Sequence, residues 1–452
     1  MWSDGIASGH RCGRTQAAAL GSSDEDVAVP NHPPVPPAPA TRGPGPLDGV
    51  VVLDFSRVLS GPHCARVLAD LGADVVKIEP PEGDMTRYAY PRVNSLATYF
   101  VQQNVGKRAI SVDLKQPAAV QVVQRLAERA DVVLENFRPG VMDRSGLGYD
   151  ELSRRNPRLV YASITGFGQT GPWRHRRAYA AVIQAESGLT RSQIEAHRRR
   201  DVHLPYVNDE HSHGDLYTSL EAAIAICSAL YRRSVTGRGQ HIDISMLDTL
   251  LAVNEHVQAE LWDEPMPAGY VRSYQPGDYV ILTVADGTSV TISGHPAEAG
   301  MFERIAAAMG RPNLAAEDSR YADPPARLAH LGELCADIQT WAATHPDSAS
   351  IERVFEKNGI AMGVLRSVRE VATSEWARER SSVMGVSDRG EGEVAVPNSP
   401  WRFSESDAGV RGMARYRGED NRAVLQDLLG LGDDEITALE DAGVLVSRIP
   451  GR

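Results

Sequence analysis

Short apolar runs alternate with amphipathic stretches through the first third of the chain. Runs of this length between polar or glycine residues predict buried strands. The predicted strands are Val50–Asp54, Asp74–Glu79, Ala109–Asp113, Asp131–Glu135 and Leu159–Ser163. Helices are predicted where proline follows Gly61, over Ala118–Ala130, and briefly near Gly140–Arg144. Strands that alternate with helices predict a parallel sheet covered by helices, so the fold class is α/β.

A longer helix is predicted to begin at Asp215. Its apolar positions recur with helical spacing, and they are Leu216, Leu220, Ala223, Ile224, Cys227, Leu230 and Tyr231. The turn Thr236–Gln240, a short strand over His241–Ile244 and a helix through Leu261 follow. Asp215 comes directly after Gly214 and has two possible roles. It is either an ordinary N-cap, or a nucleophile at the helix N-terminus, where the helix dipole favours negative charge.

Breaks in the pattern divide the chain into four parts. Residues 1–46 are rich in proline and are predicted to be a disordered tail. A large domain is predicted over 47–250, a small α+β domain over 265–345, and a C-terminal return to the large domain over 346–452. In the small domain, two short strands flank Asp286-Gly287, a pair that is typical of a hairpin turn.

Composition narrows the class of protein. A chain of 452 residues suggests two domains, or one large α/β unit with an appendage. It has no apolar run long enough for a membrane helix and no secretory pattern at its start, so we expect a soluble cytoplasmic protein without membrane contact. A net charge of −12 argues against a nucleic-acid partner. The four cysteines form no Cys-x-x-Cys pair, which argues against a disulfide framework or a thiolate zinc site.

Common nucleotide and hydrolase motifs are missing. There is no P-loop, no Gly-x-Gly-x-x-Gly after the first strand, and no Gly-x-Ser-x-Gly elbow. The segment Asp209–Asp215 contains His211 and His213, whose residue types suit a divalent ion. Polar loops often gather such residues by chance, so we expect a solvated loop here and no metal.

Five motifs, in order along the chain, resemble those of the family III CoA-transferases. This group includes formyl-CoA transferase, carnitine CoA-transferase and α-methylacyl-CoA racemase. The motifs are Leu71–Glu79, Asn104 with Lys107-Arg108 and Asp113-Leu114, Glu135–Gly140, Gly166–Pro172 and Thr236–Gln240. The resemblance runs from about Pro46 to Leu445. It implies a Rossmann-like large domain, a smaller domain and an interlocked, ring-like homodimer.

The resemblance also implies a reaction and a site. Asp215 matches the catalytic aspartate, which passes through a mixed anhydride and an aspartyl-CoA thioester while CoA moves from an acyl-CoA to a carboxylic acid. The CoA thioester is then a substrate, and no permanently bound cofactor is expected. The positions that match CoA-binding residues of the family are Val58, Lys107, Asn136, Phe137, Arg144, Arg177 and Tyr179.

Departures from the family pattern separate the alternatives. The racemase branch has a histidine where this chain has Tyr179, and a tyrosine is a poor base at neutral pH. The formyl-CoA group has glutamine at Leu59 and glutamate at Ala180, so oxalate or formate is not a safe prediction. We hypothesise that the arginines and histidines of Arg191–His213 select a carboxylated acyl group. A 2-methylacyl-CoA racemase, a metal-dependent hydrolase and a CoA-binding protein without catalysis remain alternatives.

Overall fold

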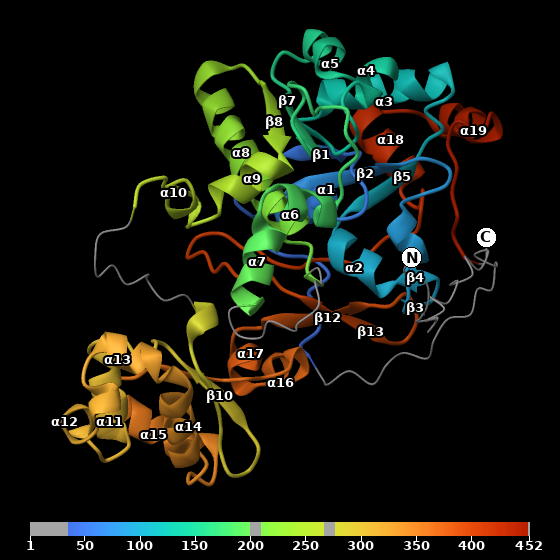
Figure 1. Cartoon of the computed structure of the whole chain (residues 1–452). Helices are drawn as coiled ribbons and strands as arrows, with labels where there is room; N and C mark the ends of the chain where they lie inside the picture. The colour runs from blue at the N-terminus through green and yellow to red at the C-terminus, as the bar shows by residue number, and fades with distance from the viewer. Residues whose placement is uncertain (1–34, 199–208, 266–275, 451–452) are drawn as a thin grey trace, which may run out of the picture.

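The chain folds into two bodies that differ in size. The computed structural model describes residues 35–198, 209–265 and 276–450. A large body surrounds a central sheet, and a smaller body is formed by the yellow and orange part of the chain (Figure 1). The chain leaves the large body after α10 (Val257–Glu260) and returns through α16 (Val368–Ala372). Both ends of the described chain therefore contribute to the large body.

A parallel sheet of six strands forms the centre of the large body. Its members are β1 (Val51–Asp54), β2 (Asp74–Glu79), β5 (Arg108–Ser111), β6 (Val132–Glu135), β7 (Val160–Thr165) and β8 (His241–Ser245). Their spatial order is β5-β2-β1-β6-β7-β8, and all neighbours are parallel. This is the Rossmann order, which reverses between β1 and β6. Open α/β sheets bind ligands outside the carboxyl ends of the strands at such a point.

The predicted parallel α/β architecture is confirmed. Each of the six predicted strands is present within two residues of its predicted bounds. The predicted helix over 118–130 is α3 (Pro117–Arg129), and proline in its first turn suits a helix start. These elements were predictable because buried parallel strands are continuous apolar runs that leave little ambiguity.

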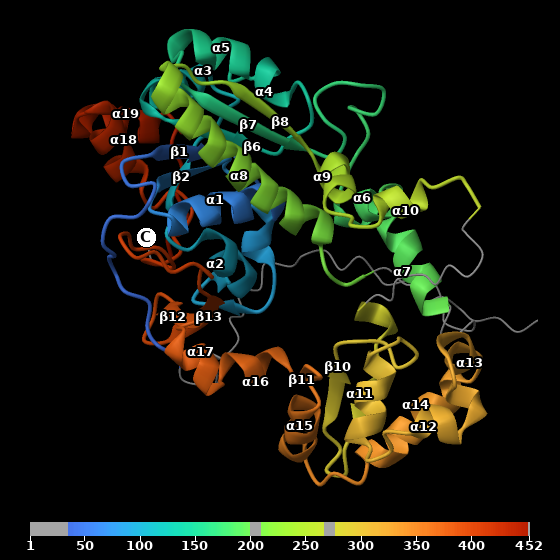
Figure 2. The same cartoon turned by 90° about the vertical axis from the view of Figure 1, so that its left-hand side faces the viewer.

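Helices cover both faces of the sheet. Neighbouring residues of a strand point to opposite faces, and Val52 and Leu53 accordingly belong to separate core clusters. The Leu53 face packs against α3, α5 (Tyr149–Arg155), α18 (Asn421–Leu429) and α19 (Asp433–Asp441). The Val52 face packs against α1 (Ser60–Asp70), α8 (His213–Thr236) and α9 (Met246–Ala252). Figure 2 shows α8 running along the sheet beside α1.

Shorter elements complete the first half of the large body. They are η1 (Met85–Tyr88), β3 (Arg92–Val93), β4 (Leu96–Ala97), α2 (Thr98–Asn104), α4 (Val141–Arg144), α6 (Ala180–Glu186) and α7 (Leu189–Arg198). The short helix predicted near 140–144 is α4. The single helix predicted through Leu261 is wrong, because it is divided into α9 and α10.

The apolar stripe predicted for α8 forms its buried face only in part, because Ala223 and Leu230 are buried but other members are not. Leu220, Ile224 and Tyr231 are exposed to solvent, Tyr231 by 74%. The buried side carries mostly small residues, Gly214, Thr218, Ser219, Ala222, Ala223, Ile226, Ala229 and Leu230. Small side chains allow α8 to lie close to α1, so helix packing rather than hydrophobicity decides which face is buried. Ile226 and Leu230 pack in the core, whereas Leu220, Ile224 and Tyr231 face solvent in the single chain.

The smaller body is a three-stranded antiparallel sheet packed against helices. The strands are β9 (Ile281–Thr283), β10 (Ser289–Ile292) and β11 (Met362–Val364), in the order β11-β10-β9. The other elements are η2 (Pro276–Asp278), α11 (Met301–Ala308), α12 (Leu314–Glu317), η3 (Ser319–Tyr321), α13 (Pro324–Ala329), α14 (Leu331–Ala342) and α15 (Ser348–Lys357). Gly287 has a φ of +90°, so the predicted hairpin turn is confirmed.

The predicted end of the small domain at 345 is too early. Ile351, Phe355 and Ile360 belong to its core, and β11 pairs with β10 through Gly363 and Thr291. The sequence places this strand far from its partner, and pairing between distant segments leaves no mark on local periodicity. The C-terminal return therefore begins after β11, with α16, α17 (Glu375–Glu379) and the hairpin of β12 (Val383–Ser387) and β13 (Glu393–Pro397).

Part of the predicted disordered tail is folded. Gly385 of β12 exchanges backbone hydrogen bonds with Pro36 and Ala38 at 2.9 and 2.6 Å. The guanidinium of Arg42 lies 2.7 Å from the carboxylate of Asp407. The prediction is therefore wrong for residues 35–46, whose prolines suit an extended segment on the sheet edge. Residues 1–34 of the predicted tail and residues 199–208 of the Arg191–His213 segment lie outside the described residues.

In the described ranges, none of the helices combines the length and the apolar character needed to span a membrane.

Candidate active site

A cavity of about 460 Å³ opens at the carboxyl ends of β1, β6 and β7. It lies where the order of the sheet reverses. Its lining combines loop residues that follow these strands with residues at the starts of α1, α6, α8 and α9. The lining residues are Arg57, Val58, Ser60, Met85, Asn136, Phe137, Arg138, Pro139, Ile164, Thr165, Gly166, Arg174, Arg176, Arg177, Ala178, Tyr179, Asp215 and Met246. Six residues singled out from the sequence meet here: Val58, Asn136, Phe137, Arg177, Tyr179 and Asp215.

Asp215 is the third residue of α8 and faces the start of α1. The N-cap of α8 is Ser212, so the possibility that Asp215 is the N-cap is wrong. Burial raises the pKa of the Asp215 carboxyl, and hydrogen bonds from the hydroxyl and backbone N–H of Ser60 oppose that rise. A partly buried carboxylate with few donors is less stabilised than one in water, which favours its reaction as a nucleophile.

The loop after β1 brings strained backbone to the cavity wall. Val58 has a φ of +70°, a region that branched side chains rarely adopt. Its N–H donates to the Asp84 carboxylate at 3.3 Å, and Asp84 lies 3.2 Å from the ammonium of Lys77. Lys77 also donates to the Ser56 carbonyl at 2.9 Å. A buried network of charges therefore holds this loop in a conformation that its sequence alone would not choose.

Position 61 must be glycine because the start of α1 lies very close to Ser56 in the preceding loop. A Cβ atom there would lie 2.1 Å from the Cβ of Ser56. Only the absence of a side chain allows the start of α1 to fold against the loop that precedes it. This contact places Ser60 beside Asp215.

Asn136 ties the loops after β1 and β6 together. Its side-chain oxygen accepts from the N–H of Arg57 at 2.9 Å, and its amide donates to the Arg57 carbonyl at 2.8 Å. The Arg57 guanidinium lies over the Phe137 ring, 5.2 Å from the centroid. Within the described residues, the buried Nε of Arg57 has no hydrogen-bond partner. Arg57 lines the cavity, so its positive charge lies close to any anionic ligand bound there.

Four further arginines make the cavity cationic. Arg138 follows β6, whereas Arg174, Arg176 and Arg177 lie on the loop between β7 and α6. Arg176 pairs with Glu186, and its guanidinium lies 4.8 Å from the Phe167 ring and 4.9 Å from the Trp173 ring. Arg176 therefore shapes the loop that carries Arg174 and Arg177. A wall of this charge suits phosphate or carboxylate groups.

Two predicted CoA-binding residues lie away from the cavity lining. Lys107 is 3% exposed, and its ammonium donates to Asp54, Asn104 and the Pro62 carbonyl, each at 2.9 Å. Burial lowers the pKa of Lys107 to about 8, while Asp54 opposes this fall. Lys107 thus lies beneath the loop after β1 and outside the cavity lining, and its predicted contact with CoA depends on the resemblance alone. Arg144 is exposed at the end of α4 and does not line the cavity.

Glu135 supports the loop after β6 from below. It is 4% exposed and accepts from the backbone N–H of Phe137 at 2.7 Å. Burial raises the pKa of Glu135 to about 7, although hydrogen bonds from Ser163 and Phe137 lower it. The Ser163 hydroxyl also lies 3.0 Å from the Nε2 atom of His241. Protonation of Glu135 is therefore linked to the loop that presents Phe137 to the cavity.

Four lining residues were not predicted as site residues from the sequence: Arg57, Ser60, Arg138 and Arg174. Arg57 and Ser60 flank Val58, and Arg138 follows Phe137, so their places after the first and fourth sheet strands were a usable signal. Arg174 has no such signal, because its approach to the cavity depends on the path of a long loop.

Asp209, His211 and His213 do come together, but outside the cavity lining. One potential ligand atom from each lies within 4.8 Å of the others. Because none of the three lines the cavity that contains Asp215, an ion there would not touch the reacting atoms. This position gives no support to a metal-dependent hydrolase.

Comparisons with known proteins show the family to which the chain belongs. The sequence model of CoA-transferase family III matches residues 47–421 of this chain. The succinyl-CoA–D-citramalate CoA-transferase of Chloroflexus aurantiacus is 33% identical over 413 residues, which span 89% of this chain and 99% of that protein. The formyl-CoA:oxalate CoA-transferase of Streptomyces coelicolor is 33% identical over 420 residues, 88% of this chain and 99% of that protein.

A solved structure supports the same assignment. The crystal structure of a CaiB/BaiF family protein from Brucella suis matches with a TM-score of 0.71 at 32% identity, and covers 85% of this chain and 99% of that one. The chain belongs to CoA-transferase family III. It is an acyl-CoA:carboxylate CoA-transferase, an enzyme class that uses a CoA thioester as substrate.

Proposed function

We propose that this enzyme moves CoA from an acyl-CoA to a carboxylic acid through covalent intermediates on Asp215. The observation that carries the proposal is the place of Asp215, a partly buried carboxylate beside the start of α1 in a cationic cavity. The resemblance to family III assigns the nucleophile to this position. A carboxylate with this setting can attack a thioester without ATP.

The reaction consists of four exchanges at carbonyl carbons. Asp215 attacks the acyl-CoA carbonyl and releases the CoA thiolate, which leaves a mixed anhydride. The thiolate attacks the Asp215 carbonyl, releases the donor acid and forms an aspartyl thioester. The acceptor carboxylate attacks this thioester and releases the thiolate again. The thiolate then attacks the acceptor's carbonyl, which forms the new acyl-CoA and restores the Asp215 carboxylate.

Groups around Asp215 suit these exchanges. Each step develops negative charge on a carbonyl oxygen, and backbone N–H groups at a helix start stabilise such charge. The Ser60 N–H at the start of α1 is one donor beside Asp215. Thiolate and carboxylate leaving groups are both anions, so the arginines of the cavity favour their retention between steps.

We propose that Val58, Asn136, Phe137, Arg177 and Tyr179 contact CoA. All five line the cavity with Asp215, which supports this assignment. Arg138 and Arg174 add charge for the phosphates, and each charge-assisted hydrogen bond contributes about 1.5–3 kcal/mol. Arg144 remains a prediction that depends on the resemblance alone.

We propose a short dicarboxylic acid as the acceptor class. The relatives described above are named for citramalate and oxalate, which carry two carboxylates. Arg57 lines the cavity together with four further arginines, and this positive charge supports a second carboxylate in the ligand. Leu59 and Ala180 depart from the formyl-CoA group, so oxalate itself is not the substrate we favour.

The racemase alternative receives no support from the cavity. That reaction needs two bases on opposite sides of an α-carbon. The described lining residues include Tyr179 but no histidine. Racemisation predicts that deuterium from solvent enters a 2-methylacyl-CoA without any acceptor acid, and we expect no such exchange.

We also propose a homodimer, as the family resemblance implies. The support in this chain is the exposed apolar side of α8, where Leu220, Ile224, Tyr231 and Val235 face solvent. Exposed patches of large apolar side chains commonly mark interfaces between chains. The wide separation of the two bodies is compatible with two chains that pass around each other.

The central test compares Asp215→Asn with Asp248→Asn. Both aspartates are the third residue of a helix, and Asp248 is exposed on α9 outside the cavity lining. We expect Asp215→Asn to lower the transfer rate on the order of 10⁴-fold or more, as loss of a nucleophile does. Asp248→Asn should transfer CoA at the wild-type rate.

Intact mass then identifies the intermediate. The wild type and Asp248→Asn, incubated with acyl-CoA and no acceptor, should gain covalently attached CoA that hydroxylamine removes. Asp215→Asn should gain nothing. Undiminished transfer by Asp215→Asn, or an adduct on another residue, would disprove Asp215 as the nucleophile.

A further inference from the structure

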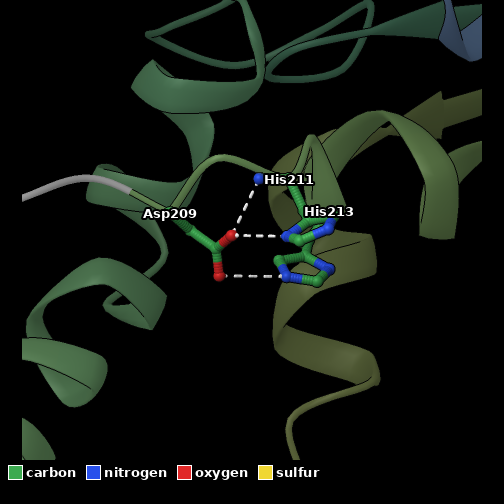
Figure 3. Close-up of side chains that lie close together, drawn as sticks. All are labelled: Asp209, His211 and His213. Carbon is green, nitrogen blue, oxygen red and sulfur yellow. Dashed lines mark hydrogen bonds and ion pairs between the residues drawn. The ribbon is translucent and has the colours of Figure 1, made fainter. Parts of the chain in front are cut away.

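A carboxylate and two imidazoles converge where the chain enters α8. Oδ1 of Asp209 lies 3.1 Å from Nδ1 of His211, and Oδ2 of Asp209 lies 3.2 Å from Nε2 of His213. Figure 3 shows both rings facing the same carboxylate from the chain that follows it. The potential ligand atoms of the three residues lie within 4.8 Å of one another. One small group could therefore contact all three side chains at once.

The chemistry of the three donors selects the kind of ligand. Imidazole nitrogens suit Zn²⁺ and its transition-metal neighbours, whereas Mg²⁺ and Ca²⁺ prefer oxygen ligands. Bonds of about 2.0–2.2 Å to each donor require the donors to lie within about 4 Å of one another. The observed spacing comes within reach of this limit through small rotations of exposed side chains, since His211 is 64% exposed.

Neighbouring residues already orient these donors. The Oδ2 atom of Asp209 accepts from the Gln193 amide of α7 at 2.9 Å, and Oδ1 accepts from the His211 backbone N–H at 2.8 Å. The His213 ring stacks on Tyr217 one turn further along α8, with centroids 5.5 Å apart. Outer contacts of this kind fix the direction of metal ligands and raise affinity.

We propose that Asp209, His211 and His213 form a binding site for Zn²⁺ or a similar transition-metal ion, separate from the catalytic cavity. Water completes the coordination, because three protein ligands leave positions open. The bound ion fixes the chain that leads into α8, where His213 is the first residue and Asp215 the third. The site stabilises the start of the helix that carries Asp215 without taking part in the transfer. The proposal does not depend on the proposed function.

The test is calorimetric titration of ZnCl₂ into the full-length chain, without a histidine tag and after removal of metal with EDTA. We expect one saturable equivalent per chain. His211→Ala and His213→Ala should each weaken binding at least about tenfold. His330→Ala is the matched control, because His330 is also a surface histidine beside one carboxylate, at 3.3 Å from Glu333. It should bind Zn²⁺ as the wild type does.

Two further measurements guard against misfolding and nonspecific binding. Asp209→Asn keeps the shape of the side chain and removes its charge, and it should also weaken binding while circular dichroism stays unchanged. Co²⁺ bound to the wild type should show visible absorption that His211→Ala lacks. The proposal is overturned by the absence of saturable binding to the wild type, by equal loss in His330→Ala, or by displacement of Zn²⁺ with a modest excess of Mg²⁺.

Discussion

Val58 holds the most constrained backbone at the cavity. Its φ of +70° costs about 1–3 kcal/mol for a side chain of this kind. The Asp84 carboxylate maintains this conformation through the Val58 N–H. Strain kept beside a reactive carboxylate is consistent with positioning of the thioester, because a relaxed loop would place its N–H and side chain elsewhere.

Replacement of Val58 by glycine tests this interpretation. Glycine adopts positive φ without strain but adds about 0.5–1 kcal/mol of unfolded-state entropy. We expect Val58→Gly to leave the free energy of unfolding unchanged or raise it by about 1 kcal/mol, while kcat/KM falls. Urea unfolding and transfer kinetics measure the two effects. Val58→Ala keeps a Cβ, so its free energy of unfolding and its kcat/KM should lie between those of the wild type and Val58→Gly. A large loss of stability in Val58→Gly would contradict the interpretation that the Val58 backbone is strained.

Lys107 offers a second prediction at the level of one residue. Lys107→Met leaves the Asp54 carboxylate buried without its partner, a change that typically costs about 3–5 kcal/mol. We expect Lys107→Met to lose thermal stability markedly, and the double variant Asp54→Asn/Lys107→Met to recover part of the loss. The control Lys115→Met changes an exposed lysine and should lose no stability. A raised KM for acyl-CoA with unchanged stability would instead restore the role that the family resemblance suggested.

The raised pKa of Glu135 predicts that the stability of the folded protein depends on pH. Its pKa of about 7 in the folded state exceeds the value of 4.5 expected when unfolded, so the folded state holds a proton that the unfolded state has released. The stabilising contribution is complete below pH 4.5 and is lost as pH rises to about 7, at about 1 kcal/mol per pH unit.

Glu135→Gln removes this titration. The stability of Glu135→Gln relative to the wild type should rise between pH 5 and about 7 and then level off. Melting temperatures across this range provide the measurement. His241 titrates nearby in both proteins and cancels from the difference. A difference that stays constant with pH would show that Glu135 does not titrate there.

At the scale of elements, local patterns predicted the strands of the large sheet and most of their helices. The family resemblance, and not the local pattern, singled out Val58, Asn136, Phe137, Arg177 and Tyr179, and these residues line one cavity with Asp215 because they follow sheet strands or begin helices. The buried role of Lys107 was hidden, because its three acceptors come from separate segments. Charge in a sequence does not reveal whether a lysine meets solvent or a buried carboxylate.

Helix α8 shows another limit of periodicity. Its large apolar residues recur with helical spacing, yet alanines and other small residues face α1. A periodic stripe predicts a helix but not which partner covers it. A side covered by a second chain gives the same pattern as one buried within its own chain.

At the scale of the whole molecule, the exposed side of α8 makes the homodimer testable. Ile224 is 59% exposed in the single chain. If this side forms the interface, light scattering should give twice the mass of one chain for the wild type. Ile224→Asp should give a smaller mass with the same circular dichroism. A monomeric wild type, or a dimer unaffected by this charge, would exclude α8 from the interface.

The folded segment before residue 47 has a practical consequence for producing this protein. A fragment cut at the start of the family match would lack the strand-like contact of Pro36 and Ala38 with Gly385, as well as the pair of Arg42 and Asp407. β12 would then present unpaired backbone groups at an open edge, which invites association between chains. Expression boundaries for this enzyme belong before residue 35, even though the catalytic motifs begin later.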